Sequence, residues 1–190
     1  MGNEHGLVMR VINACLFSIF SSVLACSKKW SNVIASSGPI TTGLPLIAMK
    51  VLGRKAKKVF EVRDLWPHGL FDFKIIRNKQ VKRLLRGLEK LIYQSADTVV
   101  TLSPGQQSYL SKLYPNFNFE VSSQISDVDL FSRSNSGSEH ESLSYGTYFI
   151  YFGGLGLIHD VLFWADFFSQ FSQKDRRLFN VLFFGAGEAE

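Results

Sequence analysis

An arginine and an aspartate stand directly after a run of residues typical of a buried strand, in the stretch FEVRDLWP from Phe60 to Pro67. Ligands bind at the carboxyl ends of the strands in open α/β sheets, so polar chemistry is expected at this point of the chain. Arg63, Asp64 and Trp66 are therefore candidate binding residues. The alternative interpretation is a salt-bridged turn that the proline closes.

Positive charge is concentrated in the first half of the chain. The sequence has 190 residues and a net charge of +5, and fifteen Lys or Arg stand against four Asp or Glu between Lys28 and Lys90. A locally basic surface attracts phosphates, anionic lipid headgroups or nucleic acid. We expect no nucleic-acid partner, because no aromatic-interleaved basic motif and no known DNA-binding pattern occurs. The hydrophobic fraction of 46% is that of a folded protein of one or two domains.

The cysteines and histidines do not predict a metal or redox site. Cys15 and Cys26 both lie in an apolar segment, which indicates a reducing cytosol rather than a disulfide framework. The histidines are scattered, and none forms a pair with ligand spacing. They are His5, His68, His140 and His159.

Strands alternate with helices from Asn32 onward, which predicts a parallel, doubly wound sheet. The predicted strands cover residues 32–36, 59–63 and 97–103, and the predicted helices cover residues 42–52, 78–94 and 104–113. A loop is expected after Trp66. Ser103 precedes Pro104 and Gly105, so we interpret it as a helix cap and not as a nucleophile elbow.

The helix predicted over residues 78–94 combines an apolar stripe with a basic remainder. The stripe follows the helical period and consists of Val81, Leu84, Leu85, Leu88, Leu91 and Ile92. The basic residues are Lys79, Lys82, Arg83, Arg86 and Lys90. Two compatible interpretations are a core-facing helix with a solvated basic back and a helix near an anionic membrane surface.

The apolar segment from Leu7 to Cys26 has three interpretations. It resembles a signal sequence, but its start contains Glu4 and lacks lysine. It is marginal in length for a membrane span, and Arg10 and Asn13 lie inside it. It also fits a core or interface helix of a folded domain.

The composition changes after residue 131. Residues 132–147 are rich in serine and predict a linker, and residues 148–190 predict a second domain of strand, aromatic-rich helix (160–171) and strand. Gly153, Gly154 and Gly156 follow the first of these strands, where amides can face phosphate oxygens. They lack the pattern of a P-loop or a dinucleotide fingerprint, so tight turns are the alternative. One strand–helix–strand unit cannot bury its own faces, which indicates missing parts.

Five stretches in order, VIASSGPITTGLP, FEVRDLWP, SADTVVTLSPG, DVDLF and YFGGLGL, resemble the family four retaining glycosyltransferases of the GT-B fold. The similarity is to the bacterial members that build O-antigen, capsule or related envelope polysaccharide. The resemblance implies a partial GT-B fold, with residues 1–131 as most of an acceptor-side Rossmann-like domain. Residues 148–190 would begin the donor-binding domain.

The resemblance implies a nucleotide-sugar donor, a lipid-linked saccharide acceptor and no metal or other cofactor. Arg63 would be available to a phosphate, and Asp64 to a sugar hydroxyl or an orienting salt bridge. Trp66 and Pro67 would shape the acceptor side. The remaining implied contacts are Ser37 and Ser103 for substrate and Gly153 and Gly154 for the donor phosphates.

The chain departs from the family pattern at both ends. Family members begin with a strand and a glycine-bearing loop, whereas residues 1–26 correspond to a later helix. The two donor-binding glutamates of the family lie beyond the GAG stretch, and Glu188 and Glu190 do not have their spacing. The Pro-Asn-Gly that usually precedes VDLF is replaced by residues 125–127. We therefore expect little activity from this chain alone and assign no catalytic residue.

Three function hypotheses follow. The first is a glycosyltransferase at the cytoplasmic face of the membrane, truncated as given, whose missing parts the flanking DNA should encode. The second is a non-catalytic remnant that keeps a basic membrane-facing or partner-binding surface. The third is an exported lipoprotein anchored at Cys26.

Overall fold

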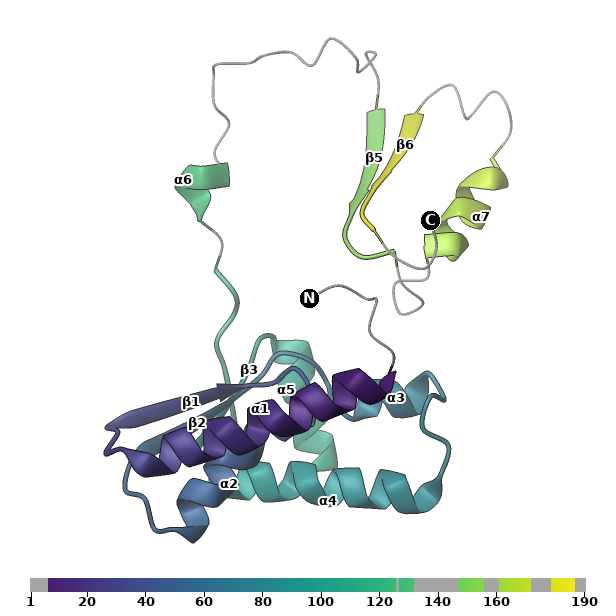
Figure 1. Ribbon diagram of the computed structural model, residues 1–190. Coiled ribbons are helices and arrows are strands. Elements are labelled where there is room, and N and C mark those ends of the chain that lie inside the picture. The colour runs from purple at the N-terminus through teal and green to yellow at the C-terminus, as the bar shows by residue number, and fades with distance from the viewer. Residues whose placement is uncertain (1–6, 126, 132–146, 156–160, 172–178, 187–190) are drawn as a thin grey trace. The chain divides into compact units, whose positions relative to one another are not determined.

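The computed structural model describes residues 7–125, 127–131, 147–155, 161–171 and 179–186 (Figure 1). The chain divides into two compact units, Met1–Asp127 and Val128–Glu190, which we call unit 1 and unit 2. The serine-rich segment predicted as a linker lies, apart from Thr147, outside the described residues.

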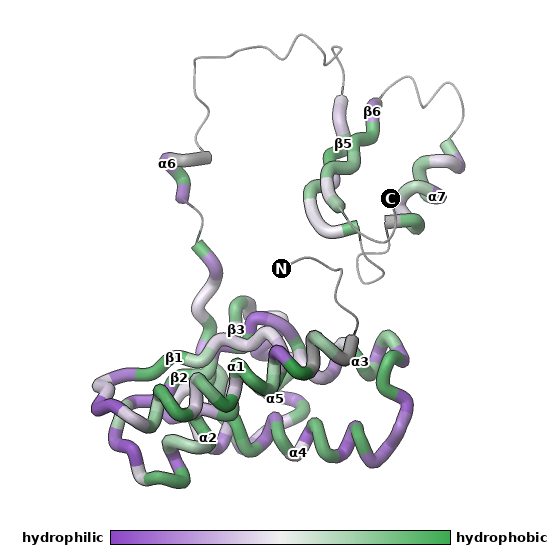
Figure 2. Tube along the Cα trace, in the orientation of Figure 1, coloured by the Kyte–Doolittle hydropathy of each residue, from purple (hydrophilic) through white to green (hydrophobic). Residues whose placement is uncertain are grey.

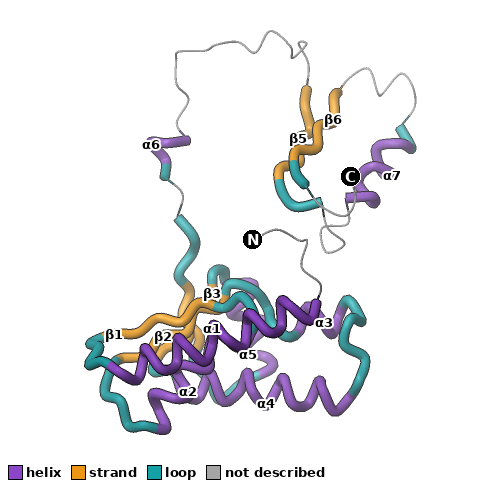
Figure 3. The backbone as a smooth tube through the Cα atoms, in the orientation of Figure 1, coloured by secondary structure: helices purple, strands orange, loops and turns teal. Residues whose placement is uncertain are grey.

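Unit 1 alternates helices with strands (Figure 3). Its four strands form one parallel sheet in the order β1-β2-β3-β4. This confirms the predicted α/β class with a parallel sheet. The elements in chain order are α1 (Leu7–Ser27), β1 (Asn32–Ser36), η1 (Ile40–Gly43), α2 (Leu44–Val51), β2 (Lys57–Val62), α3 (His68–Asp72), α4 (Lys79–Ser95), β3 (Thr98–Thr101), α5 (Pro104–Leu113) and β4 (Phe119–Val121).

The core of unit 1 lies between one face of the sheet and the helices. Ala35, Phe60 and Val99 are buried on this face and pack against Leu46 of α2 and Ile92 of α4. Because successive residues of a strand point to opposite faces, the alternate strand residues lie on the other face. A doubly wound sheet has helices on both faces. Among the described residues no helix covers the second face, so the doubly wound arrangement stays a prediction.

Two helices, α4 and α5, begin at a residue whose side chain caps them. The Asn78 side chain accepts hydrogen bonds from the amides of Gln80 and Val81 at the start of α4. Ser103 accepts from the amide of Gln106 at the start of α5, and Pro104 fills the first helical position, where its missing N–H costs nothing. The predicted cap at Ser103 is confirmed. The helix predicted over residues 42–52 is split into η1 and α2.

The apolar stripe predicted on α4 faces the core only in part. Ile92 is fully buried, whereas Leu84 is 72% exposed and Leu91 is 52% exposed. The buried arc instead includes the polar residues Glu89 and Tyr93, which contact α3 and the end of α5. Of the two interpretations of α4, the core-facing one therefore holds for part of the stripe, with Leu85, Leu88 and Ile92 at the core. The interpretation as a helix near an anionic membrane surface stays a prediction.

Three short elements were not predicted. They are α3, β4 and α6 (Val128–Phe131). The loop expected after Trp66 contains α3, a five-residue helix without a side-chain cap whose His68 and Phe71 are buried. Strand β4 has three residues and forms by pairing with β3, with Phe119 buried. Such short elements depend on tertiary contacts and lack a periodic sequence signal.

Helix α1 packs against η1 and α2. The hydroxyl of Ser18, which is 1% exposed, donates to the carbonyl of Thr41 over 2.9 Å. Ala25 forms a small buried cluster with Met49 and Ala56. These contacts agree with the interpretation of the apolar segment as a helix of a folded domain. Within the described ranges, no helix has both the length and the apolarity to cross a membrane.

The described residues of unit 2 contain the short helix α6, a parallel strand pair and a second helix. Strands β5 (Thr147–Phe152) and β6 (Phe179–Phe184) pair in register, and α7 (Val161–Ser169) lies between them in sequence. The close approach of the two strand ends requires Gly185, because a Cβ there would lie 1.8 Å from the Gly153 carbonyl oxygen. The unit is too small to bury its aromatic residues, and Phe152 is 87% exposed.

We predict that Gly43→Ala destabilises unit 1. A Cβ at Gly43 would lie 2.6 Å from two carbon atoms of Ile92, which is itself fully buried. Overpacking of this kind costs about 1–3 kcal/mol. The control is Gly87→Ala in α4, where nothing lies within 4 Å of the new Cβ, so helix propensity should stabilise the protein by about 0.5–1 kcal/mol. Urea unfolding followed by circular dichroism compares the two, and wild-type stability of Gly43→Ala would contradict the packing.

Candidate functional site

The carboxyl edge of the unit 1 sheet brings together predicted site residues from three strands. Ser37 follows β1, Arg63 and Asp64 follow β2, and Ser103 lies two residues after β3. The strands are parallel, so their carboxyl ends share one edge of the sheet. Direct hydrogen bonds join Ser37 to Arg63 and Asp64, and Ser103 is connected to Arg63 through Gln106. Their role in substrate binding stays a prediction.

Ser37 fixes the start of the loop that carries the candidate residues. Its hydroxyl oxygen accepts hydrogen bonds from the backbone amides of Arg63 over 2.9 Å and Asp64 over 3.3 Å. The Ser37 amide donates to the Glu61 carbonyl over 2.8 Å, and the residue is only 5% exposed. Ser37 therefore positions the loop after β2 through its buried hydroxyl.

Gln106 holds the same loop from the other side. Its side-chain amide donates to the carbonyl of Arg63 over 2.9 Å, and its side-chain oxygen accepts from the amide of Leu102 over 2.9 Å. The ends of β2 and β3 are thus joined by one side chain. Sequence reasoning missed this residue, although the Ser103-x-x-Gln106 spacing is that of a capping box, in which the glutamine turns back towards the helix start.

The side chains of Arg63 and Asp64 are exposed at this edge. Neither makes an ion pair with any residue of the described ranges. The alternative interpretation of the stretch, a salt-bridged turn, would require such a pair. The Arg63 guanidinium offers five hydrogen-bond donors to solvent, and the Asp64 carboxylate offers two acceptor oxygens. Ser37 and Gln106 hold the backbone of both residues in place.

Trp66 covers a small cavity below this loop. The cavity has a volume of about 10 Å³, and Ser37, Asp64, Trp66, Glu89 and Tyr93 are among the residues that line it. Trp66 is half-buried and packs against the core, and its peptide bond to the following proline is cis. The cavity separates the exposed edge from a buried polar cluster.

That cluster is centred on Glu89, whose side chain is 1% exposed. The hydroxyls of Tyr93 and Tyr114 donate to its carboxylate over 2.8 Å and 2.5 Å. The Nε2 atom of His68 lies 3.0 Å from Oε2 of Glu89, the oxygen that also accepts from Tyr114. A buried carboxylate requires such partners, because burial without them costs several kcal/mol. Sequence reasoning missed the cluster, for which the only signal was an acidic residue in the buried arc of α4.

The cluster changes the ionisation of its tyrosines. Burial raises the pKa of Tyr93 well above its ordinary value of 10.0, and the charge and hydrogen bond of Glu89 raise it further. Burial and the hydrogen bond to Glu89 likewise raise the pKa of Tyr114. Both phenols keep their protons at neutral pH and remain donors to Glu89.

In the predicted phosphate loop of unit 2, two backbone groups already make hydrogen bonds within the unit. The amide of Gly153 donates to the carbonyl of Phe184 over 2.9 Å, so it is engaged within the sheet. The hydroxyl of Tyr151 donates to the carbonyl of Gly154 over 2.8 Å. Gly156, the third glycine of the stretch, lies outside the described residues. A role of this loop in donor binding stays a prediction.

No protein-family model matches the chain, and no curated protein shows significant sequence similarity to it. The family resemblance therefore rests on the quoted motifs alone.

We predict that Tyr93 steepens the loss of stability at high pH. Above pH 10.0 the unfolded chain releases this phenolic proton while the folded chain keeps it. The contribution is fully present below that pH and falls by about 1.4 kcal/mol per pH unit above it. Urea unfolding between about pH 9 and about pH 11 measures the slope, and Tyr93→Phe should flatten it by this amount. Equal slopes for the two proteins would show that Tyr93 ionises normally.

Proposed function

We propose that the chain is a portion of a retaining glycosyltransferase of family four, with unit 1 as acceptor-side domain and unit 2 as the beginning of the donor-binding domain of a GT-B fold. The observation that carries the proposal is the exposed Arg63 and Asp64 pair, without ion-pair partners in the described ranges, on a backbone held by Ser37 and Gln106. Fixed, unpaired charges at the carboxyl edge of a parallel sheet suit ligand binding.

Each residue at the edge has a role in this proposal. The Arg63 guanidinium binds a phosphate of the acceptor, because its planar fork matches two phosphate oxygens. The Asp64 carboxylate accepts a hydrogen bond from a sugar hydroxyl, and the indole of Trp66 forms one wall of the acceptor site. Ser37 and Gln106 hold these groups in place, and Ser103 begins α5, whose positively polarised end lies at the same edge.

The proposed reaction transfers a sugar from a nucleotide-sugar to a lipid-linked saccharide. The bond between the anomeric carbon and the donor diphosphate breaks, a bond to an acceptor hydroxyl oxygen forms, and the proton of that hydroxyl passes to the leaving diphosphate. Basic groups and helix N-termini stabilise the negative charge on the leaving diphosphate without a metal. The acceptor would place the chain at the cytoplasmic face of the membrane, in the synthesis of a bacterial surface polysaccharide.

The test is binding of a short-chain polyprenyl diphosphate sugar, measured by isothermal titration calorimetry. We expect Arg63→Met to weaken binding at least about tenfold, because a hydrogen bond between charged groups contributes about 1.5–3 kcal/mol. Asp64→Asn should weaken binding less, since an amide oxygen still accepts a hydrogen bond.

Matched controls lie in the same unit. Arg77 and Asp72 are also exposed, and both lie outside the loop that Ser37 and Gln106 hold. Arg77→Met and Asp72→Asn should leave the affinity unchanged. Equal losses in Arg63→Met and Arg77→Met would reduce the interaction to general charge attraction, and the proposed acceptor site would be abandoned.

A further inference from the structure

Helix α1 points its bulky apolar side chains away from the protein. Phe20 is 71% exposed, Val23 63%, and Phe17 60%. The remaining members of this apolar face are also about half exposed or more, and they are Met9, Ile12, Leu16, Ile19 and Leu24. Isolated exposed apolar residues are common, but a contiguous stripe of eight on one helix marks an interaction surface.

The side of α1 that contacts the protein is made of small residues. Ser18 and Ala25 are buried, and Ala14, Ser21 and Ser22 are half-buried. An ordinary surface helix buries its large apolar residues and exposes its polar ones. Helix α1 has the reverse arrangement, so a second apolar environment must cover its outer face.

The serines of α1 make hydrogen bonds that do not depend on water. The hydroxyl of Ser21 donates to the carbonyl of Phe17 over 2.7 Å, and that of Ser22 donates to the carbonyl of Ser18 over 2.6 Å. The Ser27 hydroxyl donates to the carbonyl of Leu24 over 2.9 Å. Polar groups satisfied within their own helix tolerate an environment of low polarity.

The segment that contains α1 carries positive charge only. No Asp or Glu occurs from His5 through Phe60. The Lys and Arg residues of this segment are Arg10, Lys28, Lys29, Lys50, Arg54, Lys55, Lys57 and Lys58. Asp97 lies 3.0 Å from the ammonium of Lys58 and also interacts electrostatically with Lys50. The exposed cations Lys28, Lys29, Arg54, Lys55 and Lys57 can attract an anionic surface.

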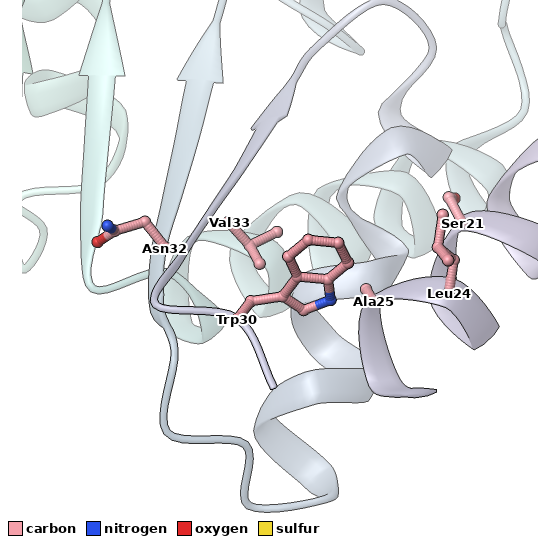
Figure 4. A pocket seen from close by; sticks show the side chains of 6 residues that line it. All are labelled: Ser21, Leu24, Ala25, Trp30, Asn32 and Val33. Carbon is pink, nitrogen blue, oxygen red and sulfur yellow. The ribbon is translucent and has the colours of Figure 1, made fainter. Parts of the chain in front are cut away.

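An aromatic residue and two lysines mark one end of the apolar face. Trp30 lies between the end of α1 and the start of β1, beside an apolar pocket of about 270 Å³ that Leu24 and Val33 also line (Figure 4). The Lys28 ammonium lies 5.9 Å from the centre of the Trp30 ring. Tryptophan and lysine together are typical of the boundary between lipid headgroups and acyl chains.

We propose that α1 lies in the plane of an anionic lipid surface, with its apolar face at the boundary of the acyl chains and Lys28, Lys29 and Trp30 at the headgroups. The hydropathy colouring shows the apolar run along α1 and the hydrophilic residues that follow it (Figure 2). A single sign of charge favours anionic lipid over a protein surface, which carries both signs. This proposal goes beyond the proposed sugar transfer and does not depend on it.

The test is sedimentation of the full chain with lipid vesicles, without donor or acceptor. Wild-type protein should bind vesicles of phosphatidylcholine with phosphatidylglycerol, and should bind vesicles of phosphatidylcholine alone much more weakly. Phe20→Ser should weaken the partitioning at least about tenfold, because a buried phenyl group is lost. Lys29→Gln should weaken it about fivefold on the anionic vesicles.

Each variant has a matched control elsewhere in unit 1. Phe73→Ser removes a phenylalanine that is 55% exposed and lies outside α1, and Lys112→Gln removes an exposed lysine at the end of α5. Both should partition like the wild type. Val23→Ser provides a second change on the apolar face, and circular dichroism verifies that each variant is folded.

Three outcomes would overturn the proposal. The first is the absence of binding to either vesicle, and the second is equal losses in Phe20→Ser and Phe73→Ser. The third is a lipid-independent dimer, seen by analytical ultracentrifugation, that Phe20→Ser converts to a monomer. That result would assign the apolar face of α1 to a second copy of the chain.

Discussion

The buried carboxylate of Glu89 is the constraint on which the arrangement of unit 1 depends. Its partners are His68 on α3, Tyr93 on α4 and Tyr114 at the end of α5, so one group joins three helices. A buried carboxylate without these partners would cost several kcal/mol, so the three helices must meet at this point. The buried arc of α4 accordingly includes Glu89 and Tyr93, while Leu84 on the same helix is exposed.

The Glu89 cluster also fixes the position of the loop that carries the candidate site. Helix α3 begins directly after Pro67, so fixing His68 against Glu89 also fixes the end of the loop that starts at Arg63. Ser37 and Gln106 hold the start of that loop through its backbone. The exposed charges of the loop therefore stand on a rigid backbone, and such preorganisation is what lets a charged group bind without a large ordering cost.

The two proposed surfaces are compatible within unit 1. Helix α1 runs antiparallel to the strands, with its last turn near the start of β1 and its first turn towards the carboxyl edge (Figure 1). A lipid surface along α1 would thus extend towards the edge that carries Arg63 and Asp64. A site that takes a lipid-linked acceptor benefits from this geometry, because the lipid part of the acceptor stays in the membrane while its polar part reaches the edge.

The sequence by itself determined the elements that local chemistry specifies. The helix starts at Asn78 and Ser103 follow from cap residues, the main strands from β-branched runs, and the candidate edge residues from a charged pair at a strand end. Tertiary structure alone decided the Glu89 cluster, the bond from Gln106 to Arg63 and the outward apolar face of α1. Each of these depends on which distant segment packs against a residue, and the helical period reports only that a face is apolar, not what covers it.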